Sequence, residues 1–212
     1  MQSKSSSWFP DWRGAAVAIV ASGPSTKKAG VGALRGRIKT IAIKENVELC
    51  PWADVVYGCD AAWWRNANGL PKYSGLKVAY QDALTAGYPD IRIIDIDRHS
   101  NAILTDEPGR LGSGGNSGFQ ALNLAVQFGV TRVLLVGFDM QRSGNLLHWY
   151  GHNNGPGRNN PGDDNFKRWR AALDGAAGTL ADLGVEVADA SESASVAYRK
   201  VSIEGALAEW GL

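Results

Sequence analysis

Short runs of consecutive apolar residues recur along this chain and alternate with stretches in which apolar residues are spaced three or four apart. The runs predict strands at residues 15–20, 40–43, 55–57, 76–80, 91–94 and 132–136. Because these runs are apolar on both faces, they are typical of a parallel sheet that helices cover on both sides. The pattern therefore predicts an α/β fold rather than an all-α or all-β one.

Helical spacing predicts helices at residues 117–128, 164–183 and 202–210. Gly129 and Gly184 follow the first two helices as C-terminal stops. Asp163 or Asp164 is expected to cap the second helix at its N-terminus. With no internal repeat, coiled coil or low-complexity linker, the chain reads as one domain over residues 15–212, after a flexible segment at residues 1–14.

One segment, residues 141–163, lacks any periodicity and is rich in Gly, Asn, Pro and aromatic residues. It is too long for a passive connection. A loop of this kind beside a parallel sheet often forms a functional wall or lid. We therefore expect it to be an active-site loop.

Composition narrows the function classes. Among 212 residues, 22 Lys and Arg stand against 21 Asp and Glu, which gives a formal net charge of +1. This balance argues against a nucleic-acid coat or a polybasic membrane binder, although a nucleic acid stays open as a substrate. No apolar run approaches the roughly 20 residues of a membrane span, and residues 1–10 are polar, so a cytoplasmic location is expected. The two cysteines predict neither a disulfide scaffold nor a zinc site.

The first candidate motif directly follows the first strand and consists of small residues, Ser22, Gly23, Pro24 and Ser25. Such a turn lets backbone N–H groups approach a phosphate or a ribose. It is neither a GxGxxG motif nor a P-loop, which would carry a Lys. The alternative is a tight strand-to-helix turn with Ser25 as the N-cap.

The second candidate motif is a glycine-rich stretch before the helix predicted at residues 117–128. Its residues are Ser113, Gly114, Gly115, Asn116 and Ser117. Backbone amides in a glycine-rich curve form a plausible cradle for an anion or a nucleotide. A purely structural turn with an N-cap is the alternative. Two such loops at one sheet edge indicate a ligand that lies across both.

Two acidic residues follow predicted strands. Asp139 comes after the strand at residues 132–136, and Asp60 comes after the strand at residues 55–57. At the carboxyl end of a parallel strand, a carboxylate could hold a ribose hydroxyl, a sugar hydroxyl or a metal ion. For Asp139, the alternative is a buried carboxylate that neighbouring loop amides satisfy.

Two of the chain's three histidines, His148 and His152, lie four residues apart in the predicted loop, on either side of Tyr150. Imidazole titrates near neutral pH, which favours a general base here. A zinc site is a weaker alternative, because the stretch is broken by Gly and no third ligand is evident. An ordinary surface position in a polar loop is the remaining reading.

Taken in order, several short motifs form a set: residues 19–25, Asn46, residues 51–54, Asp60, residues 114–118, 121–122 and 125, and residues 137–140. This set resembles a group of phage and bacterial proteins. Their relatives are the bacterial sialyltransferases, which use a Rossmann-like, metal-independent glycosyltransferase fold, and the archaeal 6-hydroxymethylpterin pyrophosphokinase-like (DUF115-type) proteins. The resemblance implies one Rossmann-like domain with a nucleotide, CMP in the sialyltransferase branch, between the two loops.

The resemblance also implies roles for single residues. Ser22, Gly23 and Ser25 match the first nucleotide loop, residues 113–117 match the second, and Asn46 matches an Asn that contacts the nucleotide. In those sialyltransferases, the segment equivalent to residues 148–150 holds a His general base and Tyr residues that bind the leaving phosphate. The local match is weaker here, so either His148 or His152 could be the base.

The resulting hypothesis is a nucleotide-binding transferase, specifically a glycosyltransferase-like enzyme that uses a nucleotide-activated sugar donor, needs no metal and employs a His base. One alternative is a pyrophosphokinase-like enzyme that uses ATP and Mg²⁺, with Asp60 and Asp139 as metal ligands. The other is a non-enzymatic phage protein that keeps the fold for binding. The host would then be a phage-infected or prophage-bearing bacterium.

The sequence leaves the partners open. The acceptor is not identified, and exposed Trp residues among the 8 could mark an interface between copies of the chain. Much of the excess Gly lies in the two candidate motifs and the loop, where backbone would approach a ligand. With a net charge near zero, we expect a phosphate to be held by amides and hydroxyls more than by Lys and Arg.

Overall fold

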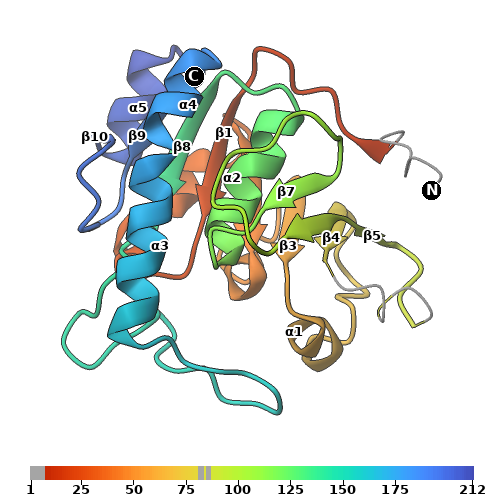
Figure 1. The fold of residues 1–212 in the computed structure, drawn as a ribbon. Helices are drawn as coiled ribbons and strands as arrows, with labels where there is room; N and C mark the ends of the chain where they lie inside the picture. Colours follow the sequence, from red (N-terminus) through yellow and green to blue (C-terminus); the bar gives the residue numbers. More distant parts are fainter. Residues whose placement is uncertain (1–7, 81–83, 85–86) are drawn as a thin grey trace.

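The structure is a computed structural model that describes residues 8–80, 84 and 87–212 (Figure 1). Its main sheet has eight parallel strands in the order β10-β9-β8-β1-β2-β3-β4-β5. Their bounds are Ala16–Val20 (β1), Lys39–Ile43 (β2), Val55–Gly58 (β3), Leu76–Ala79 (β4), Ile91–Ile93 (β5), Arg132–Val136 (β8), Glu186–Asp189 (β9) and Arg199–Lys200 (β10). A second, two-stranded parallel sheet pairs β6 (Asp95–Asp97) with β7 (Arg110–Gly112). The predicted α/β fold is confirmed.

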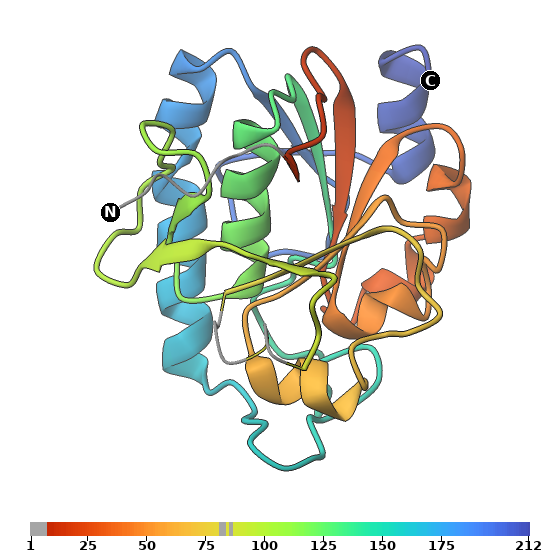
Figure 2. The ribbon, with the colours of Figure 1, turned by 90° about the vertical axis from the view of Figure 1, so that its right-hand side faces the viewer.

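Helices cover both faces of the main sheet, as Figure 2 shows. One face carries α2 (Ser117–Gln127), α3 (Asp163–Gly175) and α4 (Ala177–Asp182). The other carries α1 (Ala61–Asn66), α5 (Ile203–Glu209) and the 3₁₀ turns η2 (Thr26–Lys28), η3 (Val31–Leu34) and η4 (Lys44–Val47). Strand β1 shows the cause: Val17 and Ile19 join the first core, whereas Ala18 and Val20 join the second. Successive side chains of a strand point to opposite faces, so an unbroken apolar run fills both layers.

The strand order reverses at β1. From β1 the chain builds β2, β3, β4 and β5 on one side, and it later returns to place β8 on the other side, with β9 and β10 beyond it. Beyond the carboxyl ends of these two strands, the chain continues to opposite faces of the sheet, to η3 after β1 and to α3 after β8. In open α/β sheets, ligands bind at such a switch point.

The boundaries of the second predicted helix need correction. The expected helix at residues 164–183 is divided into α3 and α4 around Ala176. Its N-cap is Gly162 and not an Asp, because the Asn165 side chain accepts a hydrogen bond from the Gly162 backbone N–H at 2.9 Å. Gly184 follows the end of α4 at φ +72°, where a left-handed conformation favours glycine.

Part of the expected flexible N-terminal segment is packed against the C-terminal end of α2. Trp12 is buried, and its backbone N–H donates to the Phe128 carbonyl at 3.0 Å. The Phe9 ring meets the Phe128 ring edge to face. Residues 1–7 lie outside the described residues. Within the described part of the chain, no helix has the length and apolar composition needed to cross a membrane.

Candidate functional site

A pocket of about 340 Å³ lies at the carboxyl ends of β1, β2, β3 and β8 and at the first residues of α2. The loop at residues 141–163 and the beginning of α3 complete its wall. Eight of the predicted site residues line this pocket: Ser22, Gly23, Asp60, Gly115, Asn116, Ser117, His148 and Tyr150. The others lie behind its wall or away from it: Pro24, Ser25, Asn46, Ser113, Gly114, Asp139 and His152.

The loops after β1 and β8 are joined by hydrogen bonds. The Gly23 backbone N–H donates to the Gly137 carbonyl at 2.9 Å. The carboxylate of Asp139 accepts from the backbone N–H of Ser25 at 2.8 Å and also from its hydroxyl. A Cβ on Gly23 would lie 2.5 Å from the Gly137 carbonyl oxygen, so only glycine fits this contact.

Asp139 is thus a buried carboxylate that the first loop satisfies, which is the alternative considered for it above. Burial raises its pKa above the ordinary value, although the hydrogen bonds from Ser25 oppose that shift. Ser25 occupies the N-cap position of the one-turn 3₁₀ helix η2, but its hydroxyl donates to Asp139 and makes no capping hydrogen bond to that helix.

The second loop forms the N-terminus of α2. The Asn116 side chain accepts a hydrogen bond from the Phe119 backbone N–H at 3.0 Å and is the N-cap of the helix. Gly114 and Gly115 have φ values of +51° and +75°, which allow the sharp turn before it. Because Ser117 and the preceding turn line the pocket, the positive end of the α2 dipole lies at the pocket wall.

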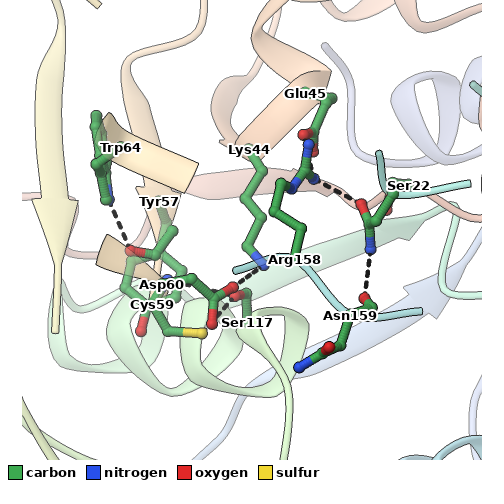
Figure 3. Close-up of polar contacts among 12 residues, drawn as sticks. Ser22, Lys44, Glu45, Tyr57, Cys59, Asp60, Trp64, Ser117, Arg158 and Asn159 are labelled. Carbon is green, nitrogen blue, oxygen red and sulfur yellow. Dashed lines mark hydrogen bonds and ion pairs between the residues drawn. The ribbon is translucent and has the colours of Figure 1, made fainter. Parts of the chain in front are cut away.

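A partly buried lysine, Lys44, lies directly after β2, and the sequence did not identify it as a site residue. Lys44 forms an ion pair with Asp60, and Cys59 and Ser117 lie beside this pair (Figure 3). Burial opposes the charge of Lys44, but Cys59 and Asp60 outweigh this effect and raise its pKa. Burial also opposes the charge of Asp60 and by itself would raise its pKa, but the positive charge of Lys44 outweighs burial, so the pKa of Asp60 is lowered. Both groups therefore stay charged at neutral pH.

Arg158, in the long loop, was not identified from the sequence either. It forms an ion pair with Glu45 of η4, and both side chains are largely buried, with 15% and 13% of their surface exposed (Figure 3). Arg158 also donates to the Asn153 side-chain oxygen at 2.6 Å. The pocket lining thus includes two cations, Lys44 and Arg158, each paired with its own carboxylate.

His148 is the histidine that reaches the pocket. Its Nδ1 lies 3.1 Å from the Ser22 hydroxyl, and its ring stacks on Tyr150 with centroids 5.0 Å apart. Burial, with a contribution from the charge of Lys44, lowers the pKa of His148 to about 4. The ring is therefore neutral at pH 7. His152 has an exposed side chain and does not line the pocket.

Trp149 attaches this part of the loop to the sheet. Its backbone N–H donates to the Ser22 carbonyl at 3.1 Å, and its indole N–H donates to the Asn46 side-chain oxygen at 3.0 Å. Asn46 is fully buried and also donates to the Ile43 carbonyl. In this structure Asn46 thus anchors the loop from behind the pocket wall.

Aromatic side chains form a wall of the pocket, and they come from α1, the loop after β8 and α3: Trp63, Phe138, Phe166 and Trp169. Tyr150, beside His148, has a pKa that burial raises well above its ordinary value, so its phenol keeps its proton at neutral pH. Among the described residues, no group of three His, Cys, Asp or Glu side chains is arranged to hold a metal ion.

No protein-family model and no curated protein matches the sequence. A similar solved structure is that of the sialyltransferase CstII from Campylobacter jejuni, described as in complex with a substrate analogue, cytidine-5'-monophosphate. The likeness has a TM-score of 0.55 and 11% sequence identity, and it covers 90% of this chain and 86% of the other. At this identity the two chains share a fold, and the function needs its own argument.

Proposed function

We propose that this protein is a nucleotide-binding transferase: a metal-independent, glycosyltransferase-like enzyme that uses a nucleotide-activated sugar donor, with CMP as the expected nucleotide. The observation that carries the proposal is one pocket at the β1–β8 switch point that combines the α2 N-terminus with a neutral, partly buried histidine, His148. The fold of this chain is similar to that of a sialyltransferase whose structure is described in complex with cytidine-5'-monophosphate, which supports this choice of ligand.

The two walls of the pocket suit different parts of such a ligand. The N-terminus of α2 and the Ser22 hydroxyl offer donors to a phosphate, and Lys44 adds a nearby positive charge. The aromatic wall, with Trp63 and Trp169, offers flat apolar surface to a base or a sugar ring. We therefore place the phosphate at α2 and the ring systems along the aromatic wall.

In the proposed reaction, His148 takes the proton from an acceptor hydroxyl. That oxygen forms a bond to the anomeric carbon of the donor sugar while the bond from this carbon to the phosphate oxygen breaks. The bonding electrons leave with the phosphate, and the amides at the start of α2 stabilise the added negative charge. Of the two histidines considered, His148 is preferred because it lines the pocket, whereas His152 is exposed.

The pyrophosphokinase alternative needs a metal ion held by Asp60 and Asp139. Each carboxylate already has another partner: Lys44 pairs with Asp60, and Ser25 donates to Asp139. We therefore prefer the glycosyltransferase proposal, and loss of nucleotide affinity on adding a chelator would reverse that preference. A phage origin, a pterin-related branch and a cytoplasmic location stay predictions from the resemblance and the composition.

Calorimetric titration with CMP, UMP, AMP and GMP tests the proposal. We expect binding, with CMP tightest, and an approximately 10-fold weaker affinity in Ser22→Ala, because a hydrogen bond to a charged group contributes about 1.5 kcal/mol. Ser74→Ala, at an exposed position away from the pocket, should bind like the unchanged protein. No detectable binding of any of the four nucleotides at millimolar concentration would overturn the proposal.

If the protein is instead a non-enzymatic binding protein, His148→Ala should leave binding of its partner intact, and neither the variant nor the unchanged protein should show sugar transfer. For the proposed transferase, the same change would leave nucleotide binding within a few-fold and abolish most sugar transfer from a CMP-activated donor. Transfer that is retained in His148→Ala and lost in His152→Ala would reassign the base to His152.

A further inference from the structure

The orientation of the Asn153 side chain is determined by its neighbours. Its oxygen accepts hydrogen bonds from Arg158 at 2.6 Å and from the Tyr150 hydroxyl at 3.0 Å. Its nitrogen donates to the Asn159 carbonyl at 2.8 Å. The Arg158 guanidinium can only donate and the Asn159 carbonyl can only accept. Exchanging the oxygen and nitrogen of the Asn153 amide would therefore break the hydrogen bonds to Arg158 and to Asn159.

This orientation constrains His148. The atom of Asn153 that faces Nε2 of His148, at 3.4 Å, is the amide nitrogen. Since that nitrogen can only donate, Nε2 must be the acceptor and carry the lone pair. A neutral imidazole has one N–H, which therefore resides on Nδ1.

The position of this proton also determines whether the Ser22 hydroxyl donates to His148 or accepts from it. With its proton on Nδ1, His148 donates to the Ser22 hydroxyl oxygen across the 3.1 Å contact. The hydrogen of the Ser22 hydroxyl is then not used for His148 and is available to another acceptor, either the neighbouring Tyr150 hydroxyl or a bound ligand. Because Ser22 lines the pocket, a bound ligand can be that acceptor.

We propose that Asn153, held in place by Arg158, is a positioning residue that keeps His148 as its Nδ1–H tautomer, so that Nε2 can accept a proton and Ser22 can donate to the ligand. The use of these two groups by a substrate rests on the proposed function. The tautomer itself does not, since it follows from contacts within the protein. During the reaction, the hydroxyl of the acceptor substrate would take the place of the Asn153 amide at Nε2 of His148. The contact that it replaces is 3.4 Å long, the longest of the hydrogen bonds described for Asn153 and His148.

The test is NMR of ring nitrogens in the ligand-free protein, labelled with ¹⁵N-histidine, at pH 7. His148→Gln identifies the His148 signals among the three histidines. We expect Nδ1 of His148 to be protonated and Nε2 to be unprotonated. Asn153→Asp places a carboxylate oxygen opposite Nε2, and should shift the neutral ring to the Nε2–H tautomer and raise the His148 pKa by about 1 or more.

Asn154→Asp is the matched control, because it adds the same charge at the next residue, where the side chain is exposed. It should leave the His148 tautomer unchanged. Protonated Nε2 in the unchanged protein would overturn the proposal, as would a folded Asn153→Asp variant that keeps the original tautomer. The measurement on the unchanged protein needs only His148→Gln, to assign the signals, so it decides even if Asn153→Asp fails to fold. Because no nucleotide is present, its result is separate from that of the calorimetry.

Discussion

At the residue scale, the pocket contains two kinds of titratable group. Lys44 and Asp60 form an ion pair that favours the charged form of each. Within the described part of the chain, His148 makes its side-chain hydrogen bonds to Ser22 and Asn153 rather than to a carboxylate, and burial together with the nearby cations Lys44 and Arg158 lowers its pKa. Folding therefore keeps His148 neutral while it keeps Lys44 and Asp60 charged.

This difference predicts a pH dependence of stability. The unfolded state takes up a proton on His148 below about pH 6.5, whereas the folded state does so only near pH 4. Because the unfolded state binds more protons between these values, the free energy of unfolding falls as pH drops through that window. Denaturant titrations at pH 7 and pH 4.5 should show a smaller fall in His148→Gln than in the unchanged protein, by about 1–2 kcal/mol.

His99→Gln is the control for that comparison, because the His99 side chain is exposed. Its stability should change with pH as in the unchanged protein. Acidic groups also titrate near pH 4, but they are common to all three proteins and cancel in the differences. An identical pH dependence in His148→Gln would show that His148 titrates normally in the folded state.

The site residues differ in how well the sequence could identify them. His148 was a candidate because histidine is rare in this chain and because Trp149 and Tyr150 follow it. Lys44 was missed, although it follows a predicted strand as Ser22 and Asp60 do. The rule that ligands bind at the carboxyl ends of parallel strands would have identified it. No such rule covers Arg158, because its position depends on how an aperiodic loop folds.

At the element scale, the two central loops after β1 and β8 need close backbone contact. Gly23→Ala would place a Cβ 2.5 Å from the Gly137 carbonyl oxygen and 2.6 Å from the Asp139 carboxyl carbon. The first neighbour is backbone, so the loops must separate. We expect the free energy of unfolding to fall by about 2 kcal/mol or more.

Gly32→Ala is the matched change, because nothing lies within 4 Å of a Cβ at Gly32 and its φ is not positive. It should leave stability within about 0.5 kcal/mol, measured by the same denaturant titration. Equal stabilities of the two variants would mean that the β1 and β8 loops can move apart freely.

Element prediction succeeded where an apolar run is continuous and failed where it is short. The strands β1 to β5 and β8 were expected at their positions because each lies in a run rich in apolar residues, on both faces in every strand except β5, where Arg92 is exposed. Strand β9, with the sequence EVAD, and β10, with the sequence RK, have too few apolar residues to be recognised. They lie at one edge of the sheet. Their positions depend on pairing with the neighbouring strand, and not on a hydrophobic pattern of their own.

At the scale of the whole molecule, the pocket forms only when the long loop is attached to the sheet. Trp149 attaches one part of the loop, through Ser22 and Asn46. The Arg158–Glu45 ion pair attaches another part, and Arg158 also orients Asn153. The loop thus brings its chemistry to residues more than a hundred positions earlier in the chain, a proximity that no local sequence pattern encodes.

The loop contains a second arginine ion pair that allows a matched comparison. Arg142 pairs with Asp163 at 2.8 Å, with 45% and 73% of these side chains exposed. Arg158→Met leaves the buried Glu45 without its partner, whereas Arg142→Met disturbs groups that water already screens. We expect the first change to destabilise the closed loop by about 1–3 kcal/mol and the second by less than about 0.5 kcal/mol.

Hydrogen exchange distinguishes a local from a global effect. In Arg158→Met, the amide of Asn153, which donates to Asn160 at 2.7 Å, and the amide of His148, which donates to Gly151 at 3.1 Å, should exchange faster. Amides in β1 and β8 should exchange at unchanged rates, because both strands lie in the core of the sheet. Equal protection of the loop amides in the two variants would show that the Arg158–Glu45 pair does not hold the loop on the pocket.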